Sequence, residues 1–285
     1  MKSYGKLYIF CLCVLIFSVD NLFSEEDLWN GEEYANHSEL QYNWATSCIQ
    51  KLQLLGNERI LDIGCGDGRV TASIAKMVPK GHVLGIDTSE SMIQVAQKYS
   101  KVLILNNINF EKLDAMKLSF NETFDLVVSF NCFHWISDKL AALRGIAKSL
   151  KLGGKAFLFF IPNWGSGGLN IKKVSSRQRW KNYFKDFSDP FTAPTPSEFA
   201  FDIEQAHLLL KRMEIVKRDD VFPNKVSFVT WLSGSIVYLK YLPKELHQAF
   251  LEEIVDCYLQ DHPADQNGKI HFVGHRMEVE LLKPY

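Results

Sequence analysis

The segment Ile60-Leu61-Asp62-Ile63-Gly64-Cys65-Gly66-Asp67-Gly68-Arg69-Val70 decides the fold class of this 285-residue chain. Its apolar beginning predicts a short buried strand. Glycines at alternate positions then allow a tight turn and let the backbone come within contact of a ligand. Apolar residues recur at helical spacing over residues 70–77, which predicts a helix directly after the turn. A strand, a glycine turn and a helix in this order form the nucleotide-binding half of a βαβ unit.

The spacing of the glycines indicates which nucleotide binds. A dinucleotide fingerprint, G-x-G-x-x-G, would need its third glycine at position 69, which is Arg69. The pattern is instead D-x-G-x-G-x-G, from Asp62 to Gly68, and it resembles motif I of the class I S-adenosylmethionine-dependent methyltransferases. That cofactor carries a sulfonium and no phosphate, so an acid at the end of the strand is tolerated. The alternative is a glycine-rich turn that binds no ligand.

A second predicted strand, residues 82–87, ends in another acid. Asp87 lies nineteen residues after Gly68, near the spacing at which a carboxylate accepts both ribose hydroxyls of a nucleoside. Its alternative role is to cap the helix that begins near Ser89. The resemblance also implies that Met92 lies under the adenine, whereas composition alone favours a packing role for it in the core.

A third acid follows the third predicted strand, within residues 108–115. The resemblance implies that Asp114 accepts a hydrogen bond from the adenine amine and that the backbone N–H of Ala115 reaches a ring nitrogen. Taken as a whole, the resemblance assigns cofactor contacts to Asp62, Gly64, Cys65, Gly66, Gly68, Asp87, Thr88, Met92, Asp114, Ala115 and Asn131.

The clearest predicted strand, residues 124–130, leads into the run Phe-His-Trp-Ile. Open α/β sheets bind ligands at that end of a strand. Together with a Y-x-x-x-S-x-x-Q pattern over residues 34–41, this run resembles the juvenile hormone acid and trans-aconitate methyltransferase group. The narrower resemblance implies that Gln41 contacts the cofactor or the substrate. It also implies that His134 and Trp135 orient an acidic acceptor or donate to it.

The chemistry of the acceptor decides what His134 would do. An ionised carboxylate is already deprotonated at neutral pH and needs no base. A hydroxyl or amine acceptor would gain from a positioned base, and His134 is then the candidate. Packing roles stay open for all three residues: Gln41 in an amphipathic helix within residues 25–55, Trp135 as a core ring, and His134 bonded to the backbone.

The later elements complete a doubly wound sheet. In order, they are a helix over 140–150, a glycine turn over 151–155, a strand over 156–160, a helix over 199–213, and a final strand pair over 215–221 and 269–282. We therefore expect a Rossmann-like, mostly parallel seven-stranded sheet flanked by helices, with an antiparallel C-terminal strand. Within a domain of residues 25–285, we expect cofactor binding in about residues 25–161 and acceptor binding in about residues 162–285.

Residues 1–24 differ in character from the rest of the chain. Lysines precede an apolar run over residues 7–17, and the small residue Ser24 precedes an acid. This pattern is typical of a secretory signal peptide and is short for a transmembrane helix. Because Leu22 fits the cleavage site poorly, a retained membrane anchor and a start codon placed too early are alternatives. Export conflicts with the use of a cytoplasmic cofactor, so the compartment stays open.

The overall composition is that of an ordinary globular protein, with 47% hydrophobic residues, 23% charged residues and a formal net charge of −1. A chain of this length can bury a large core. The near-zero net charge provides no general attraction to nucleic acid, so DNA is not an expected partner. The six cysteines and eight histidines show no paired spacing for zinc or for a disulfide framework, so no metal site is expected.

These patterns predict an S-adenosylmethionine-dependent methyltransferase that acts on a small molecule, with a carboxylic acid first among the acceptors. One alternative is a protein that binds the cofactor without turnover, in a structural or regulatory role. Another is an RNA methyltransferase, because the basic and aromatic residues 172–185 could bind RNA, an anionic membrane or an acidic small substrate. A solvated face with its aromatic residues packed inward is the simpler interpretation of that segment. The oligomeric state is not predicted.

Overall fold

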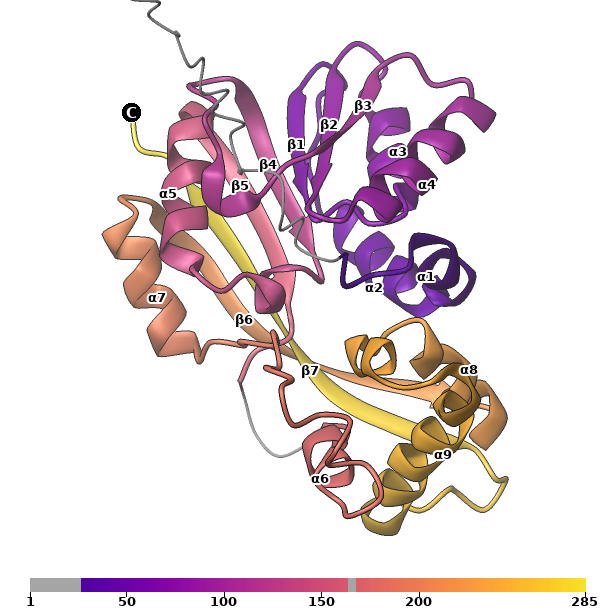
Figure 1. Ribbon diagram of the computed structural model, residues 1–285. Helices are drawn as coiled ribbons and strands as arrows, with labels where there is room; N and C mark the ends of the chain where they lie inside the picture. The colour runs from indigo at the N-terminus through magenta and orange to yellow at the C-terminus, as the bar shows by residue number, and fades with distance from the viewer. Residues whose placement is uncertain (1–26, 164–167) are drawn as a thin grey trace, which may run out of the picture.

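A seven-stranded sheet forms the centre of the computed structural model, which describes residues 27–163 and 168–285 (Figure 1). The strands lie in the order β3-β2-β1-β4-β5-β7-β6. Their bounds are β1 Arg59–Ile63, β2 His82–Asp87, β3 Ile108–Lys112, β4 Phe124–Phe130, β5 Leu150–Phe160, β6 Leu209–Phe222 and β7 Ile270–Leu282. β1 to β5 pair in parallel, whereas β7 runs antiparallel to both β5 and β6. The expected class of fold is confirmed.

Helices cover both faces of the sheet (Figure 1). Their bounds are α1 Gly31–His37, α2 Glu39–Ile49, α3 Arg69–Met77, α4 Glu90–Val102, α5 Lys139–Ser149, α6 Ile171–Ser175, α7 Pro196–Gln205, α8 Lys225–Ser233 and α9 Lys244–Asp261. Short 3-10 turns add η1 Ala115–Lys117, η2 Phe133–Trp135 and η3 Val237–Tyr241. Of the helices in the described residues, none is long and apolar enough to cross a bilayer. The signal-like residues 1–24 lie outside the described part of the chain.

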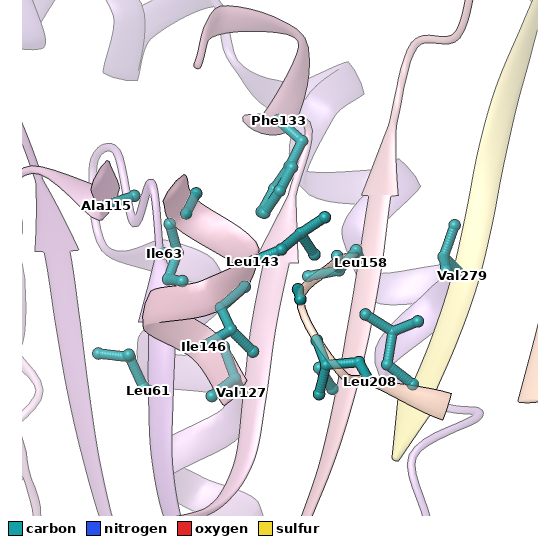
Figure 2. Packing of buried hydrophobic residues seen from close by; sticks show 14 of the residues in the cluster. Leu61, Ile63, Ala115, Val127, Phe133, Leu143, Ile146, Leu158, Leu208 and Val279 are labelled. Atoms are coloured by element: carbon teal, nitrogen blue, oxygen red, sulfur yellow. The ribbon is translucent and has the colours of Figure 1, made fainter. Parts of the chain in front are cut away.

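The central parallel strands β1 and β4 are buried on both faces, which explains their nearly continuous apolar sequences. On one face, Leu61 of β1 and Val127 of β4 pack with Ile146 of α5 in a cluster that extends to β7 (Figure 2). Successive side chains of a strand point to opposite faces, so the neighbouring Ile60 joins a second cluster with Ile74 of α3. Each such side chain contributes about 1.5–3 kcal/mol on burial, and these two clusters hold the strand ends in place.

The β6–β7 hairpin is longer than the rest of the sheet and carries a third cluster. β5 pairs with β7 only as far as Phe160, opposite Met277, whereas β6 and β7 stay paired to Phe222 and Ile270. Helices α6, α8 and α9 pack on this extension, and Figure 1 shows them below the main sheet. Their aromatic core includes Phe228, which stacks on Phe222 with a ring separation of 4.6 Å. The extension therefore forms a wall beyond the carboxyl ends of the parallel strands.

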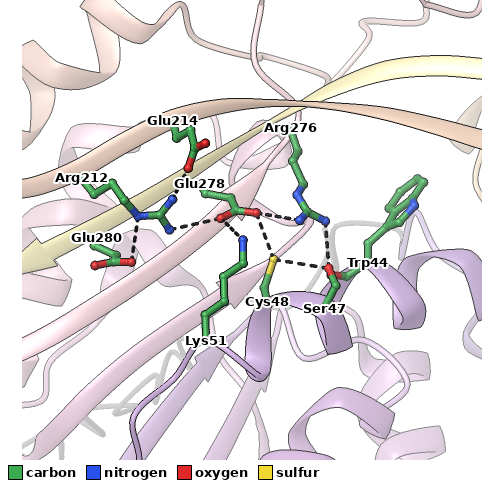
Figure 3. A network of polar contacts seen from close by, with 9 residues as sticks. All are labelled: Trp44, Ser47, Cys48, Lys51, Arg212, Glu214, Arg276, Glu278 and Glu280. Carbon is green, nitrogen blue, oxygen red and sulfur yellow. Dashed lines mark hydrogen bonds and ion pairs between the residues drawn. The ribbon is translucent and has the colours of Figure 1, made fainter.

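A buried ionic network fixes α2 against this hairpin (Figure 3). Glu278 of β7 is fully buried and accepts from Lys51 at 2.6 Å and from Arg212 at 3.2 Å. Arg276 lies 2.7 Å from its other oxygen and donates to Ser47 of α2. Burial alone would raise the pKa of Glu278, but these cations lower it. The side chains that α2 directs toward the hairpin are therefore held at fixed positions.

Two local expectations need correction. The helix expected within residues 25–55 is broken at Ser38, whose hydroxyl donates to Asp67 at 2.7 Å, so α1 and α2 are separate helices. The turn expected over residues 151–155 lies inside β5, where Gly153 has a φ of +72° and the pairing with β4 shifts its register. Glycine supplies the positive φ that this irregularity requires.

The helix expected over residues 199–213 is wrong in its second half. α7 ends at Gln205, His207 takes a left-handed φ of 57°, and Leu209 begins β6. Leu209 lies opposite Leu282 of β7 in the antiparallel ladder. Pairing across a distant part of the chain therefore overrides the local helical spacing, as tertiary context often does.

Candidate active site

A cavity of about 830 Å³ opens at the carboxyl ends of the parallel strands and continues along the β6–β7 hairpin. Small-molecule and cofactor sites are typically clefts of about 300–1,000 Å³. Most of the sequence-predicted residues line this cavity: Gln41, Gly64, Gly66, Asp87, Thr88, Met92, Asp114, Ala115, Asn131, His134 and Trp135. The fold thus brings the predicted cofactor residues and the predicted acceptor residues to one place.

The glycine turn forms the floor at the sheet end of the cavity. Gly64 and Gly66 have φ values of +74° and +53°, which side chains rarely adopt. A Cβ atom on Gly64 would lie 2.3 Å from Sγ of Cys132, so glycine is required there for packing as well. The Gly66 N–H donates to Asp87 Oδ2 at 3.0 Å, which ties the turn to the end of β2.

Each carboxylate oxygen of Asp87 accepts a hydrogen bond from a backbone N–H group. Oδ2 accepts from Gly66, and Oδ1 accepts from the Ser89 N–H at 3.0 Å. Ser89 itself caps α4, accepting from the Met92 N–H, so Asp87 is not the N-cap. Each carboxylate oxygen can accept about two hydrogen bonds, which leaves capacity for two further donors. Burial raises the pKa of Asp87, and the two backbone donors oppose that rise.

Asp114, Ala115 and Met92 form the adjoining wall. Asp114 Oδ1 accepts from the Met116 N–H at 2.8 Å and thereby caps η1. Ala115 and Met92 are both buried and present apolar surface to the cavity. The wall combines a hydrogen-bond acceptor, the Asp114 carboxylate, with apolar surface, which suits an aromatic base that carries an amine.

Asn131 contributes an unpaired acceptor. It has a positive φ of 59°, and its Oδ1 is buried without a hydrogen-bond partner. A buried polar atom without a partner is costly, and an ammonium group of a bound ligand would satisfy it. With the free capacity of Asp87, this orphaned oxygen makes the residues present here a fit for an amino-acid nucleoside cofactor.

Three predicted cofactor residues do not line this cavity. Asp62 and Cys65 line a side cavity of about 30 Å³ behind the glycine turn. The Thr71 hydroxyl donates to Asp62 at 2.6 Å, and burial raises the pKa of this carboxyl to about 7. Gly68 is the N-cap of α3 with a φ of +79°, and a Cβ there would lie 2.7 Å from that of Ala96. These residues support the turn from behind.

His134 lies on η2 and is 1% exposed. Its Nδ1 accepts from the Ile161 N–H at 3.2 Å. Burial lowers the pKa of His134 to about 3, and the positive charges of Lys139 and Arg218 add to this effect. The ring is therefore neutral with its proton on Nε2, because Nδ1 acts as an acceptor. In this state His134 can donate a hydrogen bond to a ligand but has no free lone pair to take a proton.

Gln41 is held between two partners from the C-terminal part of the chain. Its Oε1 accepts from the Trp231 indole at 3.1 Å, and its Nε2 donates to Ser235 at 2.8 Å. One amide hydrogen remains free to donate. Trp135 packs edge-on against Trp29 with a ring separation of 5.3 Å. Gln41, Trp135 and His134 thus present neutral donors and aromatic surface at the acceptor end.

Further residues line the cavity that no motif indicated: Trp29, Trp44, Phe191, Arg218, Trp231 and Tyr238. They lie far apart in the sequence, and none has a distinctive spacing. Of the basic and aromatic segment, Trp180 is fully buried and donates to Glu253 at 2.7 Å, and Arg177 bonds the same carboxylate. Phe184 also packs against the third cluster, whereas Tyr183 is exposed. No group of three or more potential metal ligands occurs within the described residues.

The comparisons with known proteins agree with this geometry. Residues 60–154 match the family model described as a methyltransferase domain. The chain is 28% identical to the juvenile hormone acid O-methyltransferase of Bombyx mori over 247 residues, which cover 80% of this chain and 85% of that protein. It is 21% identical to the trans-aconitate 2-methyltransferase of Rhodopseudomonas palustris over 248 residues, which cover 85% and 94%.

A solved structure shares the fold. Phosphoethanolamine N-methyltransferase 2 of Haemonchus contortus, in complex with S-adenosyl-L-methionine, matches with a TM-score of 0.60 and 16% identity, covering 90% of this chain and 57% of that chain. The sheet topology, the glycine turn and the matched domain define the chain as a Rossmann-like class I methyltransferase. It uses S-adenosylmethionine, and its relatives include the juvenile hormone acid and trans-aconitate methyltransferases.

Proposed function

We propose that this enzyme transfers a methyl group to a carboxylate oxygen of a small acid and releases a methyl ester. The observation that carries the proposal is the state of His134, which is neutral, engaged at Nδ1 and free to donate only through Nε2. An ionised carboxylate needs orientation and no base at neutral pH. A hydroxyl or amine acceptor would need a base that His134 is not able to supply.

The cofactor supplies, when bound, a methyl group on a sulfonium. In our proposal Asp87 accepts from the ribose hydroxyls, Asp114 and Ala115 bind the adenine, and Asn131 accepts from the ammonium group. Asp62, Cys65 and Gly68 support the glycine turn from behind. Gly64 and Gly66 let the backbone approach the methionine part, because neither carries a side chain there.

The acceptor carboxylate would lie between Gln41 and His134, with Trp135 beside it. Displacement at a methyl carbon requires the nucleophile in line with the leaving sulfur. Holding the reactants in such a geometry can supply roughly 7–11 kcal/mol of the barrier. Neutral donors suit this task, because they orient the carboxylate and leave most of its negative charge available for attack.

The proposed division of labour follows the two parts of the chain. Residues of about 25–161 would bind the cofactor, except for Gln41, His134 and Trp135, which would contact the acceptor. Residues of about 162–285 would enclose the acceptor. Aromatic rings of Trp29, Phe191 and Tyr238 line the acceptor end, so the body of the acid would be apolar. Two relatives are named as methyltransferases of acids, juvenile hormone acid and trans-aconitate, which supports the same class of acceptor here.

Methyl-labelled cofactor tests the proposal directly. The purified enzyme is incubated with the labelled cofactor and a panel of linear carboxylic acids, alcohols and amines of matched size. We expect label in a product that mild alkali hydrolyses to methanol, as a methyl ester requires. A product stable to alkali would contradict the carboxylate acceptor. Cofactor binding without any transfer to the panel or to a metabolite extract would favour a regulatory role.

A further inference from the structure

A buried guanidinium with unpaired donors lies at the hairpin end of the cavity. Arg218 of β6 is 9% exposed and lines the cavity. Its Nη1 donates to Asp220 Oδ2 at 2.8 Å. Its Nε is buried without a hydrogen-bond partner, and Nη2 bonds to no residue that the structure describes. Buried donors are normally satisfied, so a ligand acceptor is the natural partner for this group.

The surroundings fix which edge of the guanidinium is free. Its central carbon lies 3.6 Å from the ring centre of Trp44, and the Trp44 indole donates to Asp220 Oδ1 at 2.8 Å. Asp220 therefore occupies Nη1 and holds the plane of the group against the ring. The opposite edge, Nε with Nη2, presents two parallel N–H donors of the kind that bind a carboxylate in a bidentate manner.

A glycine keeps that edge open. Gly274 of β7 lies directly opposite Arg218 in the ladder and also lines the cavity. A Cβ atom at this position would lie 3.3 Å from Nη2. The φ of Gly274 is not in the left-handed region, so backbone strain does not require glycine here. The space beside the guanidinium is the feature that glycine provides.

This edge lies away from His134, the proposed hydrogen-bond donor to the reacting carboxylate at the sheet end. His134 bonds Ile161, directly after the last β5 residue paired with β7. Its β7 partner, Met277, lies opposite Ile215 of β6. Arg218 is three residues further along β6, which corresponds to about 10 Å of backbone. A charged ion pair at the reacting carboxylate would also weaken its attack, whereas an ion pair at a distant group would not.

We propose that Arg218 binds a second anionic group of the acceptor, so that the enzyme selects acids with a carboxylate at each end over monoacids. This inference rests on the proposed O-methylation of acids. Trp44, Trp231 and Phe272 line the cavity near Arg218, so the chain that joins the two carboxylates would be apolar. The preferred acceptor is therefore an elongated dicarboxylate.

The test compares matched acceptors. Azelaate is measured against nonanoate, and adipate against hexanoate, with kcat/KM as the readout. A symmetric diacid has two equivalent carboxylates, so its kcat/KM should exceed that of the monoacid twofold without any second anion site. For the better diacid and the wild-type enzyme we expect a further factor of about tenfold or more, as a bidentate charged contact provides. Arg218→Met should bring the ratio of diacid to monoacid close to that factor of two. Arg218→Lys, which keeps the charge and loses the fork, should keep part of the preference.

Two further variants retain Arg218 and its positive charge. Asp220→Asn removes the competing carboxylate while its amide oxygen can still accept from Trp44, so the KM for azelaate should fall several-fold. Gly274→Ala should crowd Nη2 and raise the KM for azelaate more than that for nonanoate. Because both variants retain Arg218, they decide the question even if Arg218→Met does not fold.

The outcomes separate the inference from the proposed function. Equal use of azelaate and nonanoate by the wild-type enzyme, or an equal loss for both in Arg218→Met, would overturn the second anion site and leave acid methylation standing. If neither these acids nor any other carboxylic acid of the panel or the metabolite extract is methylated, the proposed function is wrong. Calorimetry of azelaate with protein loaded with S-adenosylhomocysteine then decides: binding that Arg218→Met abolishes supports the site, and absence of binding overturns it.

Discussion

The two ends of the cavity are built in different ways. At the sheet end, backbone N–H groups position the acids: those of Gly66 and Ser89 hold Asp87, and that of Met116, at the start of η1, holds Asp114. At the hairpin end, side chains from distant segments meet, such as Gln41 with Trp231 and Trp44 with Asp220. The family model covers the first end, in residues 60–154, and not the second.

This difference indicates which end of the cavity provides cofactor binding and which provides selectivity for the acceptor. A site made from strand ends recurs wherever the same turns recur, so it suits a cofactor that many enzymes share. A site made from side chains on a hairpin and its helices can change residue by residue. Substitutions at the sheet end should therefore affect every acceptor equally, whereas substitutions at the hairpin end should affect one acceptor more than another.

The largest effect is expected at Asp87. Asp87→Ala removes the proposed acceptor for the ribose hydroxyls and the anchor of the Gly66 N–H. Cofactor affinity should fall by about 1–3 kcal/mol, or roughly 5- to 150-fold, as measured by calorimetry. Because burial raises the pKa of Asp87, the wild-type affinity should also decline as the pH falls, earlier than for an exposed aspartate. Unchanged affinity in the variant would rule out the ribose assignment.

His134 should affect turnover and leave cofactor affinity nearly intact. His134→Ala removes the proposed donor to the acceptor, and misplacing a reactant can cost about 10²-fold in rate. His134→Gln, whose amide can donate in place of Nε2, should recover part of that loss. Since the pKa of His134 is lowered to about 3, kcat/KM should show no ionisation of this residue near neutral pH. A loss of activity on the acidic side that disappears in His134→Gln would identify a base instead.

A smaller effect is expected for Gln41→Glu. The new carboxylate can keep the bond from the Trp231 indole, but it removes the free amide donor and places a negative charge beside the acceptor. The kcat/KM for an acid should fall by about tenfold, or about 1.4 kcal/mol, with cofactor affinity unchanged. A weaker cofactor with an unchanged KM for the acid would place Gln41 at the other end of the cavity.

The smallest effect on binding is expected at Asp62. Asp62→Asn should change cofactor affinity little, because Asp62 lies in the side cavity behind the turn. Its pKa rises from 3.8 in the unfolded chain to about 7 on burial, so the stability it provides at low pH is lost as the pH rises through that value. The difference in Tm between the variant and the wild type should therefore shift in favour of the variant as the pH rises from acidic to mildly alkaline. A large loss of cofactor affinity would place Asp62 in the binding site itself.

The same contrast explains how much the sequence could predict. The glycine turn, Asp87 and Asp114 stand beside their strands in the sequence, and their side-by-side placement follows from the parallel order of the sheet. Arg218 and Gly274 carry no such signal in the sequence, because only the register of β6 with β7 places them opposite each other. The helix wrongly expected over residues 199–213 failed for the same reason: the partner strand lies some seventy residues away, at Leu282 and its neighbours.

The state of His134 also needed the structure. Its place after β4 could be read from the sequence, but its pKa depends on burial and on the Ile161 N–H, which β5 supplies. The sequence therefore left the roles of base and donor open, and the geometry favours the donor.

A crystal structure of the enzyme with S-adenosylhomocysteine and azelaate would show whether one cavity holds both the cofactor and the acid. We expect the ribose hydroxyls on Asp87, one carboxylate within hydrogen-bond distance of His134 Nε2, and the other on the free edge of Arg218. A nucleoside bound away from Asp87, or an acid bound outside this cavity, would contradict the proposed site.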